Sequence, residues 1–290
     1  MRIGEVYGNG RFGLSFEIFP PKSEAGEVQL FAALDELMAF KPSMVTCTYG
    51  AGGSTREKTL ELTVKIRETF RVTTTAHLTC VGSTVGQLRQ WLRDATEQGV
   101  ENLIALRGDP PKGESGFTQL EGGLRHGNEL VALIRQEFPH FGVGVAGYPE
   151  THQEAPSPEV DLENLKRKVE AGADAVITQL FYDNRDFFEF RERYEKAGIK
   201  APLVPGILPV IHVAQIQKIA SLCGATLPAS FLADLERHRD DPEGQIDVGV
   251  EYGIRQCQEL IDAGVPGVHF YVLNKAGAPS RILRGLHLPR

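Results

Sequence analysis

The sequence predicts an α/β fold in which residues 1–290 form one (β/α)8 TIM barrel, with extra helices between the seventh and eighth strands. Eight short apolar runs rich in β-branched residues recur along the chain, and a segment with helical apolar spacing follows each run. The first four runs begin roughly 29 to 30 residues apart, which is typical of βα units. Eight alternating units favour a closed parallel barrel over an open doubly wound sheet, which usually has fewer strands.

The predicted elements follow one another without a Pro/Gly/Ser-rich linker. Helix starts are marked by Ser54 and Thr84 as N-caps, and the long gap before the last strand is predicted to hold two additional helices near 230–237 and 248–263. Glycines stand where helices should stop before the next strand, at Gly99, Gly172, Gly198 and Gly264. The predicted strands span residues 14–19, 44–49, 73–79, 102–107, 143–148, 175–181, 203–208 and 268–273.

The composition excludes several classes of protein. Lysine and arginine together number 31 and aspartate and glutamate 38, so the net charge is −7 and no basic cluster offers a footprint for nucleic acid. No apolar stretch approaches the roughly 18 residues of a membrane span, and the N-terminal residues 1–13 lack the apolar core of a signal peptide. We therefore expect a cytoplasmic protein that binds neither nucleic acid nor membrane. Reduced thiols are expected because no CxxC or Cys/His ligand spacing connects Cys47, Cys80, Cys223 and Cys257.

Polar side chains gather at the carboxyl ends of the predicted strands, where the active site of such a barrel lies. Each also has a structural explanation. Taken alone, Glu17 fits an ion pair with an interior Arg or Lys as well as it fits catalysis, His77 fits a hydrogen-bonded core histidine, and Gln179 could satisfy a neighbouring backbone group. Because most strands contribute to one mouth, the set as a whole favours function: Glu17, Thr48, Tyr49, His77, Arg107, Asp109, Tyr148, His152, Gln179, Asn274 and Lys275.

A polar face of one predicted helix also leaves two interpretations open. Asp161, Asn164, Arg167 and Lys168 lie on the same side of the helix that follows the fifth strand. A solvated face with a Glu163–Arg167 ion pair explains this pattern. Beside a cofactor, the same basic face would meet phosphate groups.

Other motifs are set aside. The GxGxxG pattern at 142–147 runs through a predicted strand and no helix follows it at once, so a Rossmann turn is disfavoured. The chain has no GxSxG elbow, which disfavours covalent acyl transfer. No metal is predicted, because neither HxxxH nor HExxH spacing connects His77, His126, His152 and His269.

Nine motifs along the chain resemble, in the same order, those of the methylenetetrahydrofolate reductase family. They are SFEIFPP (15–21), TYGAGGSTRE (48–57), AHLTC (76–80), ALRGDPP (105–111), AGYPETHQEA (146–155), NLKRKVEAGAD (164–174), ITQLFYD (177–183), PGILPV (205–210) and HFYVLNK (269–275). The resemblance implies a barrel that binds FAD non-covalently and reduces 5,10-methylenetetrahydrofolate to 5-methyltetrahydrofolate with NAD(P)H, within one-carbon metabolism and methionine biosynthesis. It also implies the bacterial type, which lacks the C-terminal regulatory domain of eukaryotic enzymes, and we expect a homo-oligomer.

The resemblance implies a ping-pong reaction in which NAD(P)H reduces FAD and leaves before the folate binds the same face. Glu17 matches the general acid that protonates N10 of the folate, and FAD N5 then delivers hydride. A proton donor near neutral pH needs the pKa of Glu17 to rise from about 4.3 towards about 6 or 7, and burial between Phe16 and Ile18 favours that rise. Asp109 matches the family aspartate beside the flavin and the pterin, where it would stay ionised.

Further positions match ligand contacts of the family. The FAD-contacting positions, whose Arg and Lys would meet the diphosphate, are Tyr49, Ala51, His77, Arg107, Gly108, Asp109, Tyr148, His152, Ala155, Asp161, Asn164, Arg167 and Lys168. The substrate positions are Glu17, Thr48, Asp109, Gln179, Gln215, Tyr271 and Lys275, of which Lys275 would face the glutamate tail of the folate. The chain departs from some family members at Lys275 (Arg), Ile219 (Phe) and the pair His126–Gly127 (Tyr-Ala).

Two alternative functions stay open. A different flavin barrel oxidoreductase, for example one resembling proline dehydrogenase, would use the same barrel and cofactor without needing Glu17, Asp109 and Gln179 together. An inactive folate-binding or partner subunit would need no flavin. The choice between NADH and NADPH also stays open, because no pocket for a 2′-phosphate is evident in the sequence.

Overall fold

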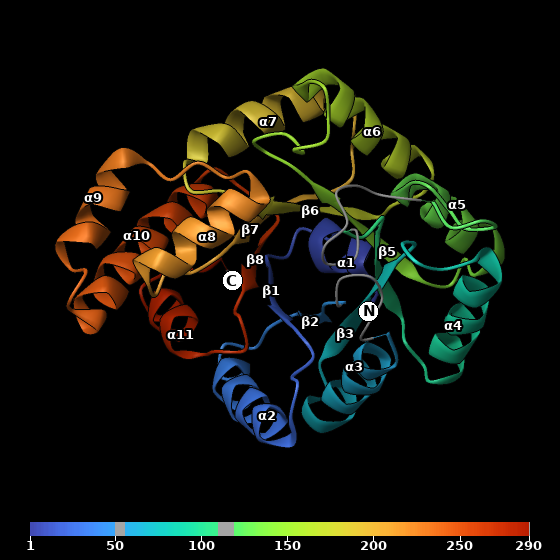
Figure 1. Ribbon diagram of the computed structural model, residues 1–290, viewed down its shortest axis with the longest axis horizontal. Coiled ribbons are helices and arrows are strands. Elements are labelled where there is room, and N and C mark those ends of the chain that lie inside the picture. The colour runs from blue at the N-terminus through green and yellow to red at the C-terminus, as the bar shows by residue number, and fades with distance from the viewer. Residues whose placement is uncertain (50–55, 110–118, 290) are drawn as a thin grey trace.

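The computed structural model describes residues 1–49, 56–109 and 119–289, and its centre is a closed barrel of eight parallel strands (Figure 1). Each strand pairs with the next in the chain, and the last pairs with the first through Gly13 opposite Gly267. The predicted (β/α)8 fold is confirmed. The strands are β1 Gly13–Ile18, β2 Met44–Cys47, β3 Thr73–Thr79, β4 Asn102–Leu106, β5 Gly142–Gly147, β6 Ala175–Leu180, β7 Leu203–Ile207 and β8 Gly267–Tyr271.

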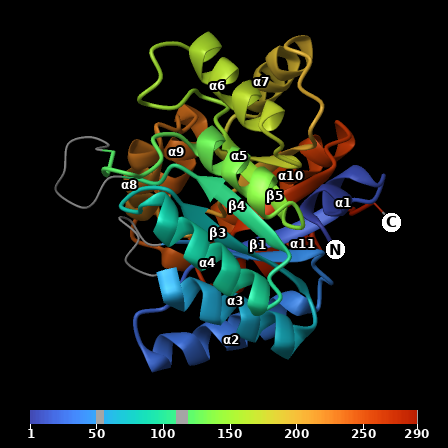
Figure 2. The same cartoon turned by 90° about the vertical axis from the view of Figure 1, so that its right-hand side faces the viewer.

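Helices surround the barrel on all sides (Figures 1 and 2). Apolar side chains of these helices, such as Leu92 and Leu130, are fully buried against the outer faces of the strands. Packing against the sheet therefore fixes the helices, as expected for amphipathic segments. They are α2 Glu24–Met38, α3 Arg56–Phe70, α4 Val85–Glu97, α5 Gly127–Glu137, α6 Pro158–Glu170, α7 Asn184–Lys196, α8 Val213–Cys223, α9 Ala229–Arg237, α10 Pro242–Asp262 and α11 Gly277–Arg284.

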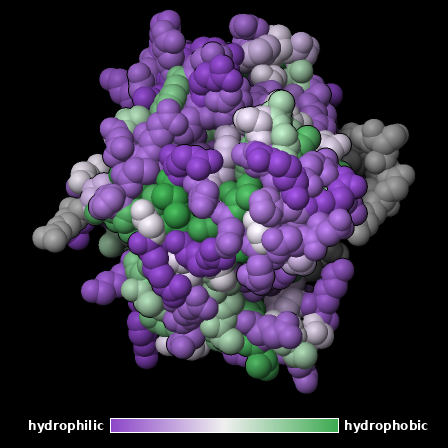
Figure 3. Space-filling view, turned by 90° about the vertical axis from the view of Figure 1, so that its left-hand side faces the viewer, coloured by the Kyte–Doolittle hydropathy of each residue, from purple (hydrophilic) through white to green (hydrophobic). Residues whose placement is uncertain are grey.

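The two additional helices before the last strand are confirmed as α9 and α10. The second of them begins earlier than predicted, at Pro242, because Asp241 caps the helix by accepting a hydrogen bond from Gly244 N at 3.1 Å. The face that carries α9 is mostly hydrophilic, with small hydrophobic areas between the charged side chains (Figure 3). Within the described part of the chain, none of the helices has both the length and the apolar character needed to cross a bilayer.

The predicted helix boundaries mostly hold. Thr84 caps α4 and accepts a hydrogen bond from Gln87 N at 3.2 Å, and the glycines at all four predicted helix ends have positive φ. Ser54 and Ala51 lie outside the described residues. Several strands end one or two residues before their predicted bounds, and the GxGxxG glycines lie in β5.

A short N-terminal helix, α1 (Ile3–Gly8), closes the amino-terminal end of the barrel and was not predicted. Its side chains of Ile3, Val6 and Tyr7 are buried and pack against interior residues of the strands, including Met44 and Ile104. Figure 1 shows α1 in the centre of the ring of strands. Six residues are too few for a helical apolar period to stand out, so only the packing reveals this helix.

Candidate functional site

A cavity of about 700 Å³ opens at the carboxyl ends of the strands, opposite α1. Its volume lies within the range of small-molecule sites, about 300 to 1,000 Å³. The cavity collects residues from most of the strand ends, as the sequence predicted for the mouth of the barrel. The predicted site residues that line it are Glu17, Tyr49, His77, Arg107, Gly108, Asp109, Tyr148, His152, Ala155, Asp161, Asn164, Arg167, Lys168, Gln179 and Tyr271.

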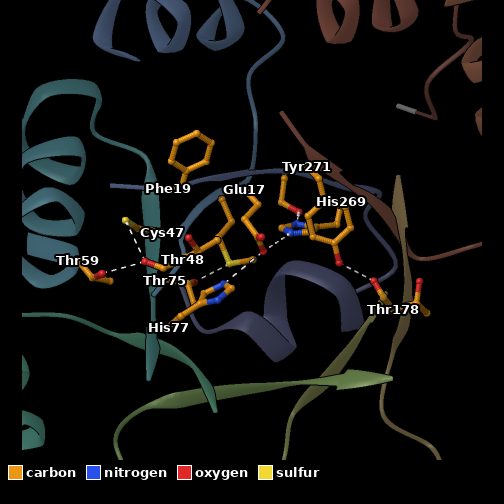
Figure 4. A network of polar contacts seen from close by, with 12 residues as sticks. Glu17, Phe19, Cys47, Thr48, Thr59, Thr75, His77, Thr178, His269 and Tyr271 are labelled. Carbon is orange, nitrogen blue, oxygen red and sulfur yellow. Dashed lines mark hydrogen bonds and ion pairs between the residues drawn. The ribbon is translucent and has the colours of Figure 1, made fainter. Parts of the chain in front are cut away.

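A buried ionisable group in this cavity is the carboxyl group of Glu17 on β1. Its Oε2 lies 3.3 Å from Nε2 of His77 on β3 and 3.2 Å from Nε2 of His269 on β8 (Figure 4). The side chains of Glu17, His77 and His269 are 16%, 8% and 0% exposed, respectively. We call these three residues the acid corner. The interior partner of Glu17 is thus a pair of imidazoles and not the Arg or Lys of the structural interpretation.

The acid corner reverses the pKa shift expected for Glu17. Burial raises the pKa of this carboxyl group, but the charge of His77 and the hydrogen bond from His269 together lower it by more than burial raises it. The resulting pKa is about 2. The expectation of a raised pKa is therefore wrong for the protein without ligand. That expectation was based only on Phe16 and Ile18, the sequence neighbours of Glu17. The imidazoles of His77 and His269, which lower the pKa, come from strands far away in the chain.

His269 connects the acid corner to the closed end of the barrel. Its Nδ1 lies 2.7 Å from Ser15 Oγ, and Ser15 Oγ lies 2.6 Å from the hydroxyl of Tyr7 on α1. The ring of Tyr271 packs edge-on against His269 with the centroids 5.2 Å apart, and its hydroxyl donates to Thr178 O at 2.6 Å. From the sequence, His269 is a candidate metal ligand only, and this role was not predicted. Its place two residues before Tyr271 on the same strand was the available signal, since alternate residues share a face.

The opposite side of the cavity carries the basic residues, which we call the cationic rim: Arg107 after β4, and Arg167 and Lys168 on α6. Lys168 Nζ donates to Ala146 O at 2.6 Å and lies 5.9 Å from the ring centroid of Tyr148. Burial lowers the pKa of Lys168 to about 8, although the charge of Asp161 acts in the other direction. The ammonium group of half-buried Lys168 is thus less solvated than that of an exposed lysine. An anionic ligand beside it would therefore be stabilising.

Local structure holds the cationic rim in place. Ser157 caps α6, with Pro158 in its first turn, and His152 N donates to Asp161 Oδ2 at 3.1 Å. Arg107 donates to both carboxylate oxygens of Glu154, at 2.5 and 2.8 Å. Glu154 lines the cavity but was not predicted as a site residue, although it lies within the AGYPETHQEA motif.

The polar face of α6 combines both of its interpretations. Arg167 Nε lies 3.4 Å from Glu163 Oε1, and both side chains are more than half exposed, at 58% and 53%. This is the ion pair of the solvated-face interpretation. Asp161, Asn164 and Lys168 nevertheless line the cavity together with Arg167. The same helix face therefore meets both the solvent and the cavity.

Three predicted substrate residues do not line this cavity. The backbone carbonyl of Thr48 accepts from Thr59 Oγ1 at 2.8 Å, and Gln215 is exposed on α8. Lys275 is exposed and lines a second cavity of about 310 Å³, which shares Tyr271 and Leu273 with the first.

Two further candidates also have structural partners. Asn274, a strand-end candidate, exchanges hydrogen bonds with both backbone groups of Phe19, at 3.0 and 2.8 Å. Gln179 lines the cavity and also accepts from Leu180 N at 2.9 Å, as the structural interpretation predicted. The departures Ile219, His126 and Gly127 line the main cavity.

Neither metal nor disulfide chemistry appears in the described residues. They contain no group of three or more His, Cys, Asp or Glu side chains able to hold a metal ion. All four cysteines are free, and three of them, Cys47, Cys80 and Cys257, are buried. Burial raises the pKa of Cys47 and Cys257, which keeps these thiols protonated.

A (β/α)8 barrel that brings a buried carboxyl group and a set of cations to one mouth belongs to the class of barrels with a built small-molecule site. The sequence model of the family described as "Methylenetetrahydrofolate reductase" matches residues 2–287, and the chain belongs to this family.

Individual relatives agree with this assignment. "Methylenetetrahydrofolate reductase (NADH) 1" of Zea mays is 38% identical over 99% of this chain and 50% of its own length, so the chain spans about half of that relative. "5,10-methylenetetrahydrofolate reductase" of Escherichia coli (strain K12) is 38% identical over 92% of this chain and 88% of its own length. An uncharacterized protein from Clostridium thermocellum, solved with 5-methyl-5,6,7,8-tetrahydrofolic acid, shares the fold with a TM-score of 0.63 and 12% identity, covering 98% and 97% of the two chains.

Proposed function

We propose that this chain reduces 5,10-methylenetetrahydrofolate to 5-methyltetrahydrofolate with NAD(P)H, using non-covalently bound FAD in a ping-pong reaction. The observation that carries the proposal is the single cavity in which Glu17 lies on one side and Arg107 and Lys168 on the other. A hydride acceptor that needs protonation and a cofactor that carries phosphates could share such a cavity. Membership of the reductase family supports the same reaction.

The residues at the cationic rim fit FAD. Arg107, Arg167 and Lys168 would hold the diphosphate, and the lowered pKa of Lys168 indicates a cation with an incomplete set of polar partners. Thr79 Oγ1 lines the cavity and is buried without a hydrogen-bond partner in the described part of the chain, so a ligand atom could satisfy it. When bound, FAD would supply hydride transfer from the nicotinamide to the folate through its N5 atom.

Glu17 is proposed to protonate N10 of the folate and so open its five-membered ring. With a pKa of about 2, Glu17 is a carboxylate in the protein without ligand and must first take up a proton. A bound pterin would exclude water from the carboxylate, which favours the protonated form. The imidazoles of His77 and His269 lie close enough to Oε2 to pass a proton to it.

Other residues are proposed to orient the substrate. Asp109 is exposed at the mouth, where its negative charge would stabilise the cationic iminium that ring opening produces. Gln179 would contact the pterin from β6, and Lys275 would attract the glutamate tail from the neighbouring cavity. Gln215 and Thr48 are retained as proposed substrate contacts, although neither lines the main cavity.

Two half-reactions test the proposal. The purified chain, loaded with FAD, should show a flavin absorption spectrum that NADH or NADPH bleaches without oxygen, and titration with each nicotinamide identifies the preferred one. Addition of 5,10-methylenetetrahydrofolate should then restore the spectrum. Bleaching without restoration by this folate would indicate a different flavin oxidoreductase. Failure to take up FAD would indicate a folate-binding or partner subunit.

A further inference from the structure

A continuous line of side chains crosses the interior of the barrel from its closed end to the acid corner. It begins at the hydroxyl of Tyr7 on α1 and passes through Ser15 on β1, 2.6 Å away, and then to Nδ1 of His269 at 2.7 Å. The other ring nitrogen of His269, Nε2, lies 3.2 Å from Oε2 of Glu17 (Figure 4). Tyr7, Ser15 and His269 are 3%, 0% and 0% exposed, so the line is shielded from solvent.

The barrel is built around the Tyr7 end of this line. A Cβ atom placed on Gly13, at the start of β1, would lie 2.6 Å from the Tyr7 ring. A Cβ on Gly267, at the start of β8, would lie 2.9 Å from the same ring. These two glycines, which face each other in the ladder, leave the space that the aromatic ring occupies.

The chemistry of the two ends determines the direction of the hydrogen bonds. Within the described residues, Ser15 Oγ is the sole hydrogen-bond partner of the Tyr7 hydroxyl, and a buried phenol must donate its proton to remain satisfied. Ser15 then accepts from Tyr7 and donates its own proton to Nδ1 of His269. His269 is left with its proton on Nε2, and it donates this proton to Glu17.

We propose that Tyr7 is a positioning residue that fixes the direction of this hydrogen-bond line, so that His269 presents an N–H group to Glu17 and holds it as a carboxylate. The inference rests on the geometry of the closed barrel and does not depend on the reaction proposed above. If Glu17 were protonated and donated to Nε2, every bond in the line would reverse. Tyr7 would then accept from Ser15, and its own proton would lose its partner.

The other groups that face Glu17 do not replace this line. His77 from β3 lies at 3.3 Å, but its Nε2 has no aligned hydrogen-bond partner among the described residues. Among the described residues, Cys47 from β2 and Tyr271 from β8 are further titratable groups near Glu17, and the charge of Glu17 adds to burial in raising the pKa of both. His269 is therefore the neighbour whose proton position responds to Tyr7.

The test is the protonation pattern of the His269 ring, measured by 15N NMR of histidine-labelled protein near neutral pH and assigned with the His269→Gln variant. The wild-type ring should carry its proton on Nε2. In Tyr7→Phe, which keeps the ring and removes the donor, the ratio of Nδ1–H to Nε2–H forms should rise about tenfold. Tyr194→Phe is the matched control, because it removes a buried hydroxyl that donates to Ala201 O at 2.8 Å, away from the line.

Three outcomes would overturn the inference: a wild-type His269 protonated on Nδ1 alone, a doubly protonated wild-type ring, or a folded Tyr7→Phe variant with an unchanged ratio. If Tyr7→Phe does not fold, Tyr7→Leu provides the same test, because it also removes the hydroxyl that donates to Ser15 and leaves Ser15 able to accept from Nδ1. Tyr7→Leu should show the same rise in the Nδ1–H form. An unchanged ratio in that variant would equally contradict the proposal.

Discussion

The acid corner and the cationic rim, on opposite sides of the cavity, stabilise their charged groups in different ways. In the acid corner, Glu17 is 16% exposed and His269 is fully buried, and the charged group is satisfied by other side chains of the barrel. On the cationic rim, Arg167 is 58% exposed and forms an ion pair with Glu163, while Lys168 donates a hydrogen bond to the backbone carbonyl of Ala146. In the acid corner, protein side chains pair with the charged group, whereas the cationic rim can still bind an anion.

This difference indicates which side the fold has fixed in advance. Buried ionisable groups must have their partners in place before a ligand arrives, because an unpaired buried charge is strongly unfavourable. Exposed cations have water as a partner and can exchange it for phosphate. Substitutions in the acid corner should therefore have large effects on chemistry and on the pH dependence of stability, and substitutions on the rim should have smaller effects on cofactor affinity.

The largest effect is expected for Glu17→Gln on the folate half-reaction. Loss of a positioned proton donor costs about 10² to 10⁴ in rate, and the isosteric amide keeps the shape of the site. Stopped-flow absorbance should show slow reoxidation by 5,10-methylenetetrahydrofolate, whereas reduction by the nicotinamide largely persists and acts as the internal control. Equal survival of the two steps would contradict the role of Glu17 as the acid.

The same residue should govern acid stability. The folded-state pKa of about 2 lies below the ordinary value of 4.5, so the unfolded chain binds more protons between these values and stability falls as the pH is lowered through them. The shift corresponds to about 3 kcal/mol. Urea unfolding from about pH 5 to about pH 3 should show a smaller loss of stability in Glu17→Gln than in the wild type. Glu57→Gln, which removes an exposed carboxyl group, is the control and should lose stability as the wild type does.

On the rim, Lys168→Met should weaken FAD binding about tenfold to a hundredfold, because it removes one charge-assisted hydrogen bond to the cofactor. Titration monitored by flavin fluorescence measures this. Because the pKa of Lys168 is lowered to about 8, wild-type affinity should also decrease as the pH rises above that value, and the variant should lack this dependence. Lys166→Met, on the same helix but paired with Glu170 at 3.9 Å, is the matched control and should bind FAD as the wild type does.

The smallest effect is expected for Arg167→Gln. An exposed cation contributes at most about 1 kcal/mol, so FAD affinity should fall by no more than about fivefold, and added salt should reduce the difference. The same fluorescence titration at low and high ionic strength checks this. A loss as large as that of Lys168→Met would remove the distinction between half-buried and exposed cations of the rim.

Much of the fold was predictable because each βα unit carries its own local signal. The alternation of apolar runs and helical stripes predicted all eight strands, and the strand ends predicted that residues as distant as Glu17 and Tyr148 share one cavity. The helix α1 was missed because its six residues are held by packing and not by periodicity. Gln215 was assigned to the site by family resemblance alone, and such a resemblance does not determine which side chains reach the cavity.

The sequence by itself determined the barrel, its polar mouth and its family, because apolar periodicity, turn residues and ordered motifs are properties of local segments. Only the tertiary structure decided the charge of Glu17. Its pKa depends on His77 and His269, which reach it across the barrel. Electrostatic interactions and hydrogen bonds depend on distance in space, and closure of the barrel brings residues 17 and 269 to within 3.2 Å.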